Sequence, residues 1–343
     1  MNRIELPSPP RRILLIKPSA LGDVVHTLPV LNLLRRRWPD ANITWLIASA
    51  FAGLVEGHPQ LSDVITFDRN RLAQSWYNPR AAVELLRFIR GLRLQPFDLV
   101  IDLQGLFRSG TLTALTRAPV RVGFSNAREL AHLFYTHHVP IDTMDQHAID
   151  RCLNVTEALG CGREPVEFHF VTGDGDRSHI DQLLNGVGRY AVLLPGTNWL
   201  TKRWPIDKFA SIVQPLRQQL GLSTIVAGGP DVVELAAQIP SAVNLAGKTT
   251  LRQLVALIER SQLVIANDSG PMHIAAALNK PLVTMFGPTN PLRTGPYRRL
   301  ESVVRVDIPC SPCYSRKCSH TSCMRWISSE AVMAESAQQL RSP

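Results

Sequence analysis

Short apolar segments alternate with helical patterns along the whole chain. In the first half, the segments that read as strands are 12–17, 43–48, 64–67, 99–103 and 120–124, and the helical patterns are 23–38 and 81–94. In the second half, the strands are 190–194, 223–227, 242–245, 263–266 and 282–286, and the helical patterns are 205–220, 251–260 and 274–278. Strands that alternate with helices form a parallel sheet covered on both faces. The pattern therefore predicts an α/β fold.

The length of the chain predicts two domains. Its 343 residues are more than one hydrophobic core usually holds. The segment 171–178 contains two glycines and several polar residues, which makes it the best linker candidate. We therefore expect an N-terminal domain over residues 1–172 and a C-terminal domain over residues 173–343.

The net charge of +9 favours anionic partners, which include nucleic acid, phosphorylated ligands and an acidic membrane face. The basic residues are scattered except for Arg35-Arg36-Arg37, which ends a predicted helix, where cations are favourable anyway. A membrane-facing role is the alternative for this triplet. The first twelve residues do not form a signal peptide, and no run approaches the roughly 18 apolar residues of a membrane span. We expect a cytoplasmic protein with reduced cysteines.

Two turns between a strand and a helix carry the strongest functional signal. Asn267-Asp268-Ser269-Gly270-Pro271-Met272-His273 follows an apolar strand and precedes a helix of small residues. Lys17-Pro18-Ser19-Ala20-Leu21-Gly22-Asp23 occupies the matching place in the first half. Open α/β sheets bind ligands at the carboxyl ends of their strands, and a helix N-terminus attracts phosphate. One such turn in each half predicts a substrate held between two domains.

Other short motifs narrow the class of ligand. No Gly-x-Gly-x-x-Gly follows the first strand, and Gly247-Lys248-Thr249 has Ala242 where a P-loop needs glycine, so a dinucleotide oxidoreductase and an NTPase are disfavoured. In the loop 194–205, Thr197 offers a hydroxyl and Lys202 a cation, a pair that suits a diphosphate. A lysine before a helix is more often simply solvated.

Several segments in the same order resemble one family, the ADP-heptose:lipopolysaccharide heptosyltransferases of glycosyltransferase family 9. The resemblance covers nearly the whole chain, and its segments are 13–29, 100–106, 127–129, 201–205 and 267–273. It implies a GT-B fold, in which two Rossmann-like domains with parallel sheets face each other across a cleft. The N-terminal domain would bind the acceptor sugar and the C-terminal domain the nucleotide sugar. GT-B tails often cross back to the first domain, and the segment 329–340 is a candidate for such a helix.

The resemblance also implies the partners. They are an ADP-activated sugar, a lipopolysaccharide core acceptor and an anionic membrane surface, with no nucleic acid, no cofactor and no metal. The protein would lie on the cytoplasmic face of the inner membrane. The acceptor, Kdo or a first heptose, stays open. Three alternatives also remain open: another nucleotide sugar or acceptor within the family, a nucleotide-sugar 2-epimerase, and a non-catalytic membrane-surface assembly factor.

Asp23 matches the family's base position and would take the proton of the attacking acceptor hydroxyl. An aspartate at a helix start is otherwise explained by capping. The charge that grows on the leaving diphosphate would be met by Lys202, by Thr197 and by the N–H groups of Ser269 and Gly270.

Further residues match substrate contacts. Asp268 corresponds to a contact with the donor sugar, and Asp231 and Thr249 to positions near ribose and adenine. His273 is either a buried, hydrogen-bonded histidine or a phosphate contact. The expected acceptor-side residues are Lys17, Ser19, Arg69, Arg71 and Arg128, although each arginine could equally be a solvated surface charge.

The C-terminal segment carries four cysteines close together in sequence, with His320 among them. C-x2-C is a metal-type spacing, but four ligands this close lack the usual second pair. Reduced structural thiols are the favoured interpretation and metal binding the alternative. The cysteines are Cys310, Cys313, Cys318 and Cys323.

Overall fold

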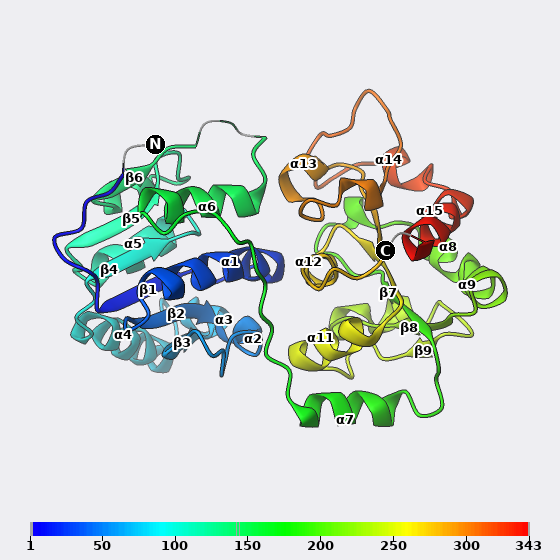
Figure 1. The fold of residues 1–343 in the computed structure, drawn as a ribbon, viewed down its shortest axis with the longest axis horizontal. Coiled ribbons are helices and arrows are strands. Elements are labelled where there is room, and N and C mark those ends of the chain that lie inside the picture. Colours follow the sequence, from blue (N-terminus) through cyan, green and yellow to red (C-terminus); the bar gives the residue numbers. More distant parts are fainter. Residues whose placement is uncertain (1–2, 142, 144, 342–343) are drawn as a thin grey trace. The chain divides into compact units, whose positions relative to one another are not determined.

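The computed structural model describes residues 3–141, 143 and 145–341, and it divides into two compact units, Met1–Val171 and Thr172–Pro343. Each unit is built on a six-stranded sheet in which neighbouring strands are parallel (Figure 1). Helices pack against these sheets, as the alternating pattern requires. The predicted α/β fold is confirmed. We call the two parts the N-terminal unit and the C-terminal unit.

The N-terminal unit has the sheet order β3-β2-β1-β4-β5-β6. In chain order its strands are β1 (Arg12–Ile16), β2 (Asn42–Ala48), β3 (Asp63–Phe67), β4 (Leu99–Asp102), β5 (Val120–Phe124) and β6 (His137–Val139). Its helices are α1 (Leu21–Arg37), α2 (Ser49–Ala52), α3 (Arg69–Leu72), α4 (Pro79–Leu94), α5 (Phe107–Leu115) and α6 (Ala148–Ala158), with a 3-10 turn, η1 (Ala131–Phe134).

The C-terminal unit has the sheet order β12-β11-β10-β7-β8-β9. Its strands are β7 (Tyr190–Leu194), β8 (Ser223–Val226), β9 (Val243–Asn244), β10 (Leu263–Asn267), β11 (Leu282–Met285) and β12 (Val303–Val304). Its α-helices are α7 (Asp174–Leu183), α8 (Ile206–Ser211), α9 (Val213–Leu220), α10 (Val233–Ala236), α11 (Leu251–Arg260), α12 (Gly270–Ala277), α13 (Pro291–Thr294), α14 (Ser322–Arg325) and α15 (Ser329–Arg341). Its 3-10 turns are η2 (Leu200–Lys202), η3 (Pro230–Val232) and η4 (Leu300–Ser302).

Both units share one topology, because each sheet follows the Rossmann order 3-2-1-4-5-6 when its own strands are counted from its start. The order reverses direction between β1 and β4 in the first unit and between β7 and β10 in the second. These pairs are directly hydrogen-bonded, with Leu15 opposite Ile101 and Ile265 opposite Leu193. Ligands of such sheets bind at the carboxyl ends of the strands at this switch point. The topology therefore identifies one candidate site edge in each unit.

The central strands are buried on both faces, which explains their nearly continuous apolar sequences. Helix α4 begins at Pro79, behind the Asn78 side chain that accepts from two backbone N–H groups, and it packs through Leu92 on the first sheet. In the second unit, Trp204 and Phe209 fill the space between sheet and helices, with ring centroids 4.9 Å apart. Burial of such side chains contributes about 1.5–3 kcal/mol each.

Two predicted helix boundaries are wrong, and part of the expected linker forms a helix; each difference has a local cause. The helix predicted at 205–220 is split into α8 and α9, because Pro215 has no N–H to continue the first helix. The expected linker 171–178 is largely helical, since Asp176 accepts from the Gly173 N–H and starts α7. Helix α12 begins at Gly270, four residues before the predicted start, because Pro271 is well suited to a first helical turn.

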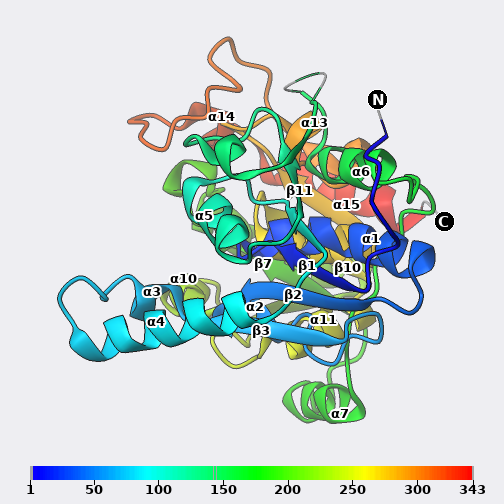
Figure 2. The same cartoon turned by 90° about the vertical axis from the view of Figure 1, so that its left-hand side faces the viewer.

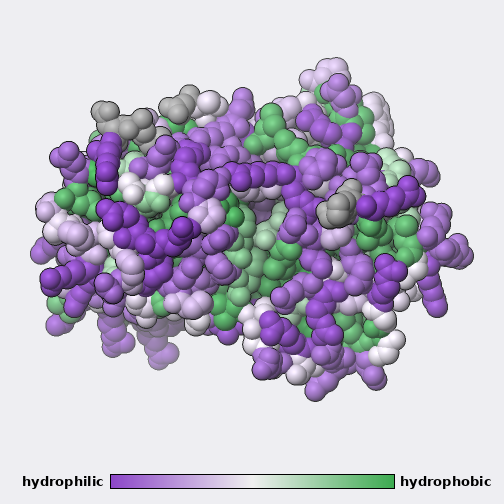
Figure 3. Space-filling view, in the orientation of Figure 1, coloured by the Kyte–Doolittle hydropathy of each residue, from purple (hydrophilic) through white to green (hydrophobic). Residues whose placement is uncertain are grey.

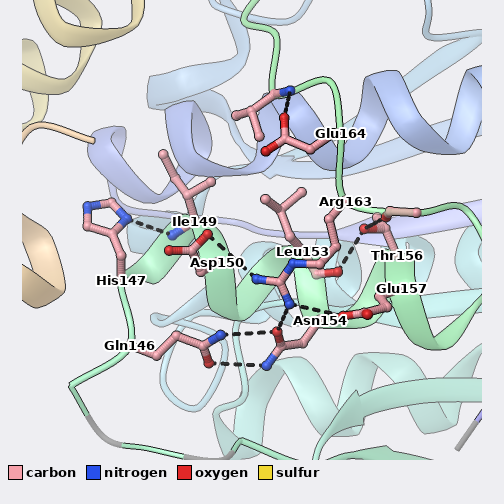
Figure 4. A network of polar contacts seen from close by, with 12 residues as sticks. Gln146, His147, Ile149, Asp150, Leu153, Asn154, Thr156, Glu157, Arg163 and Glu164 are labelled. Carbon is pink, nitrogen blue, oxygen red and sulfur yellow. Dashed lines mark hydrogen bonds and ion pairs between the residues drawn. The ribbon is translucent and has the colours of Figure 1, made fainter. Parts of the chain in front are cut away.

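A polar network fixes the segment that follows α6 (Figure 4). Arg163 donates to Asn154 at 2.6 Å and pairs with Glu157 at 3.0 Å and with Asp150 at 3.6 Å. Asn154 and Gln146 exchange two hydrogen bonds of 3.1 Å. Together these contacts hold both ends of α6 and the chain beyond it within the N-terminal unit.

Helix α15 packs against β10, β11 and β12 of its own unit. Its expected return to the first domain stays a prediction. On the face drawn in Figure 3, hydrophilic side chains cover most of each unit. None of the helices in the described residues is long and apolar enough to cross a membrane.

Candidate functional site

The turn after β1 presents Asp23 at the switch point of the N-terminal sheet. Its Oδ1 lies 3.2 Å from Lys17 Nζ, and its Oδ2 accepts from the Ala20 N–H at 3.1 Å. The Lys17 side chain is only 7 % exposed and also donates to the Leu103 carbonyl at 2.8 Å, whereas the Asp23 side chain is 40 % exposed. The capping contact that competes with a catalytic role is therefore present. The carboxylate is nevertheless held in place and open to solvent.

The neighbouring turn after β4 depends on a buried carboxylate, Asp102. Its Oδ1 accepts from the backbone N–H groups of Gln104 and Gly105, and its Oδ2 accepts from the Tyr135 hydroxyl at 2.6 Å. Burial raises the pKa of Asp102, and the hydrogen bonds that it accepts oppose this rise. The Gln104 side chain in turn accepts from the Ser19 N–H at 3.4 Å. Asp102 thus shapes the turn that lies beside Asp23.

The three predicted acceptor arginines do not form one cluster. Arg69 and Arg71 follow β3, and Arg128 follows β5, so four strand spacings, about 19 Å, separate the two groups across the sheet. Arg69 and Arg128 are exposed. Arg71 instead donates to both carboxylate oxygens of Glu84, at 2.9 and 3.0 Å, which raises the pKa of the arginine. Arg71 therefore ties α3 to α4.

In the C-terminal unit, Lys202 and Asp268 form the central ion pair of the switch point. Lys202 Nζ lies 2.6 Å from Asp268 Oδ2, which also accepts from the Thr289 hydroxyl at 2.6 Å. The Lys202 side chain is 15 % exposed and that of Asp268 is 5 % exposed. A buried carboxylate with a lysine and a hydroxyl is stable only because both donors are in place.

The loops around this pair are joined by hydrogen bonds between side chains and backbone groups. The Asn267 amide donates to the Pro195 carbonyl at 2.8 Å and accepts from the Trp204 N–H at 3.0 Å. The buried Thr197 hydroxyl donates to the Asp268 carbonyl at 3.1 Å. The loop after β7 and the turn after β10 therefore form one rigid surface, with Lys202 in it.

Helix α12 begins at this surface. Ser269 is its N-cap residue and Gly270 its first helical residue. The first N–H groups of a helix have no partner inside it, and they attract anions. Among the described residues, the buried Ser269 hydroxyl has no hydrogen-bond partner. His273 is buried one turn further on.

Asp231 and Thr249 lie at the ends of the next two strands. Asp231 belongs to η3 after β8, and Thr249 follows β9. The Gly247 N–H donates to the Gly228 carbonyl at 2.9 Å, which joins these two loops. Strands β8 and β9 lie one and two positions from β7 in the sheet, on the side away from β10.

The cysteine-rich segment is linked to the loop after β7. The Thr201 hydroxyl donates to the Ser315 carbonyl at 2.8 Å, and Arg316 and Lys202 each lie 4.6 Å from the ring centroid of Trp199. All six cysteines are free thiols. Within the described residues, no three histidine, cysteine, aspartate or glutamate side chains are arranged to hold a metal ion. The segment therefore supports the Lys202 loop.

Sequence reasoning missed Asp102, Tyr135, Asn267 and Thr289 as functional supports. Asp102 and Asn267 lay inside the quoted segments, and their place at the end of β4 and β10 was the available signal. Tyr135 is 33 residues from Asp102, and Thr289 is 21 residues from Asp268. Nothing in the local sequence indicates these two contacts.

Comparison with known proteins gives one consistent result. The model of glycosyltransferase family 9 (heptosyltransferase) matches residues 85–324, which is most of the chain. Lipopolysaccharide heptosyltransferase 1 of Pseudomonas aeruginosa is 32 % identical over 90 % of this chain and 88 % of its own length.

Solved structures agree with the family match. A family 9 glycosyltransferase from Veillonella parvula, 26 % identical, superposes with a TM-score of 0.79 over 96 % of this chain and 97 % of its own. The E. coli heptosyltransferase WaaC with ADP, 27 % identical, gives 0.76 over 96 % and 99 %. These similarities confirm the expected GT-B fold and the resemblance noted in the sequence. The chain belongs to glycosyltransferase family 9 and is a heptosyltransferase.

Proposed function

We propose that this enzyme transfers heptose from ADP-heptose to the inner core of lipopolysaccharide, with inversion at the anomeric carbon. The names of its relatives support the acceptor, and the solved relative with bound ADP supports the nucleotide. Membership of a heptosyltransferase family favours transfer over an epimerase or an assembly factor.

One observation carries the mechanism: each switch point holds a lysine–aspartate pair, and the two pairs expose opposite charges. In the N-terminal unit the aspartate is 40 % exposed and its lysine 7 %. In the C-terminal unit the lysine is 15 % exposed and its aspartate 5 %. The first unit therefore presents a carboxylate to a ligand and the second an ammonium group.

A carboxylate in the N-terminal unit and an ammonium group in the C-terminal unit are the two charges that a direct displacement needs. The exposed Asp23 carboxylate accepts the proton of the attacking acceptor hydroxyl, while Lys17 and the Ala20 N–H keep it in position. Ser19 lies beside it and contributes to the acceptor site. Arg69 and Arg128 meet acidic groups of the acceptor from opposite sides of the switch point.

The donor diphosphate lies against Lys202 and the N-terminus of α12. Lys202 and the N–H groups at Ser269 and Gly270 oppose the charge that develops as the diphosphate leaves. The Ser269 hydroxyl donates to the same group, and Thr197 keeps the loop rigid. Asp268 fixes Lys202 and contacts the heptose hydroxyls. This cationic support makes the reaction independent of a metal ion.

Asp231 and Thr249 bind the nucleoside part of the donor, beyond the diphosphate. They stand on loops that a hydrogen bond between Gly247 and Gly228 joins. His273 is placed in the same helix as the diphosphate contacts. The N-terminal unit binds the acceptor, and the enzyme works at the cytoplasmic face of the inner membrane, where its lipid-linked acceptor lies.

ADP release in the presence of ADP-heptose and a core acceptor tests this proposal. Asp23→Asn should abolish most of the acceptor-dependent release. Asp207→Asn is the matched control, because Asp207 is also an acidic residue in the first turn of a helix and is exposed. Equal activity of the two variants would refute Asp23 as the base.

A further inference from the structure

The most exposed aromatic residue of the described chain lies just before α4. The Trp76 side chain is 84 % exposed, and it stacks edge-on against the exposed Tyr77 at 4.7 Å between ring centroids. Figure 2 shows this loop projecting at the end of α4, along the outside of the N-terminal unit. An aromatic pair this exposed contributes little to the packing of the fold.

Helix α4 carries apolar side chains on both of its faces. Its inner face packs on the sheet through Ala81, Phe88 and Leu92, which recur at helical spacing. On the opposite face, Val83, Leu86 and Leu94 are exposed large hydrophobic residues. They alternate around that face with the exposed arginines Arg87, Arg90 and Arg93.

The charge of this region is strongly one-sided. Residues 69–94 contain six arginines and a single acidic residue, Glu84, which gives a net charge of +5 within a chain of net charge +9. Glu84 is itself paired with Arg71. More than half of the excess positive charge is thus concentrated in 26 residues.

We propose that the face formed by the Trp76-Tyr77 loop and the outer side of α4 docks on an anionic lipid bilayer. A helix with exposed aliphatic residues between arginines, next to tryptophan and tyrosine, has the composition of an interfacial membrane segment. Arginines place their charge at the headgroups while their stems and the aliphatic side chains enter the apolar layer. This inference deepens the proposed membrane location by assigning it to one surface.

Charge complementarity selects this occupant over the others. A second copy of the chain would bring the same positive charge against itself, which is unfavourable. Nucleic acid would satisfy the arginines but would leave Val83, Leu86 and Leu94 without an apolar partner. An anionic bilayer matches both properties of the surface.

Vesicle flotation with the full chain tests the proposal. We expect binding to phosphatidylcholine vesicles that contain phosphatidylglycerol and little binding to phosphatidylcholine alone. Each basic residue near an anionic surface changes the partition coefficient about fivefold, so Arg87→Gln/Arg90→Gln/Arg93→Gln should lose roughly 100-fold. The matched control, Arg189→Gln/Arg217→Gln/Arg305→Gln, removes the same charge from exposed positions of the C-terminal unit and should lose less than about threefold.

The aromatic loop has its own matched pair of variants. Trp76→Ser should weaken binding roughly tenfold and reduce the quenching of tryptophan emission by brominated lipid. Trp326→Ser, at a tryptophan 64 % exposed in the C-terminal unit, should change neither quantity. Equal losses in the α4 and control variants, or no preference for the anionic vesicles, would overturn the proposal.

Binding of ADP, measured by calorimetry on the same samples, separates this inference from the proposed function. The α4 and Trp76 variants should bind ADP as the wild type does. Their urea unfolding curves, resolved for the two units, should match those of the wild type, which shows that the N-terminal unit folds. Loss of vesicle binding with intact ADP binding supports the docking surface. Intact vesicle binding in these variants refutes it and leaves the proposed transferase reaction untouched.

Discussion

Lys202→Met removes the ammonium group at the centre of the donor-side surface and keeps the length of the side chain. The pair that it breaks has an N–O distance of 2.6 Å, with the Asp268 side chain buried and the Lys202 side chain 15 % exposed. At an effective dielectric constant of about 20, two unit charges at this distance interact by about 6 kcal/mol, and desolvation offsets much of this. Removal of one partner of such a pair costs about 3–5 kcal/mol of unfolding free energy.

The same substitution should weaken the binding of ADP. A charge-assisted contact contributes about 1.5–3 kcal/mol, so calorimetry should show a loss of roughly 10- to 150-fold. Asp268→Asn should instead keep ADP affinity within a few-fold, because Lys202 remains available to the diphosphate. The double variant Lys202→Met/Asp268→Asn should be more stable to urea than Lys202→Met alone, because it buries no carboxylate that lacks a positively charged partner.

Two results of the calorimetry and urea experiments would contradict this reasoning. Wild-type affinity for ADP in Lys202→Met would move this residue out of the donor site. If the double variant unfolds at the same urea concentration as Lys202→Met, the ion pair is not what stabilises the loop. The unfolding curves have to be resolved for the two units, because a chain of two units need not unfold in one step.

Three other perturbations test separate parts of the account. Asp23→Asn should lower turnover by about 10²–10⁴ with ADP affinity unchanged, as calorimetry and steady-state kinetics can show, since only the base is lost. Asp102→Asn should flatten the pH dependence of urea unfolding. Because the pKa of Asp102 is raised in the folded protein, this group adds stability below its pKa in the unfolded chain, about 3.9. That added stability is lost as the pH rises through the pKa of Asp102 in the folded protein. A constant difference between wild type and variant across pH would contradict this. Higher salt should raise the acceptor Michaelis constant, because exposed charges are screened beyond about 8 Å, and Arg69→Gln/Arg128→Gln should reduce this response while ADP binding stays the same. A wild-type salt response in that double variant would make both residues ordinary surface charges.

Strand positions were predictable because burial on both faces leaves a nearly continuous apolar sequence. β1, β5 and β7 lie within one residue of the predicted segments. Helix boundaries were less predictable, because they depend on single residues such as Pro215 and Asp176. The short β6 was not predicted, since three residues carry too little periodicity.

The sequence predicted which segments carry the residues of the candidate site, but not which of these residues contact each other. Asp23, Lys202 and Asp268 could be found because each lies in the segment between a strand and the body of the following helix. The pairing of Lys202 with Asp268 spans 66 residues, and nothing in the sequence predicts that these side chains meet or that Asp268 is the more buried of the two. Nor does the sequence show that Arg71 forms an ion pair with Glu84, because that contact depends on how α3 and α4 pack against each other.

Product analysis tests the central claim most directly. The enzyme is incubated with ADP-heptose and a panel of truncated core acceptors that end in Kdo or in a first heptose, and the products are examined by mass spectrometry. The account predicts the addition of one heptose to one acceptor of the panel in a chelator-treated sample, and its loss in Asp23→Asn but not in Asp207→Asn. Absence of any heptose adduct with the wild-type enzyme, or a product that forms only when metal is restored, would contradict it.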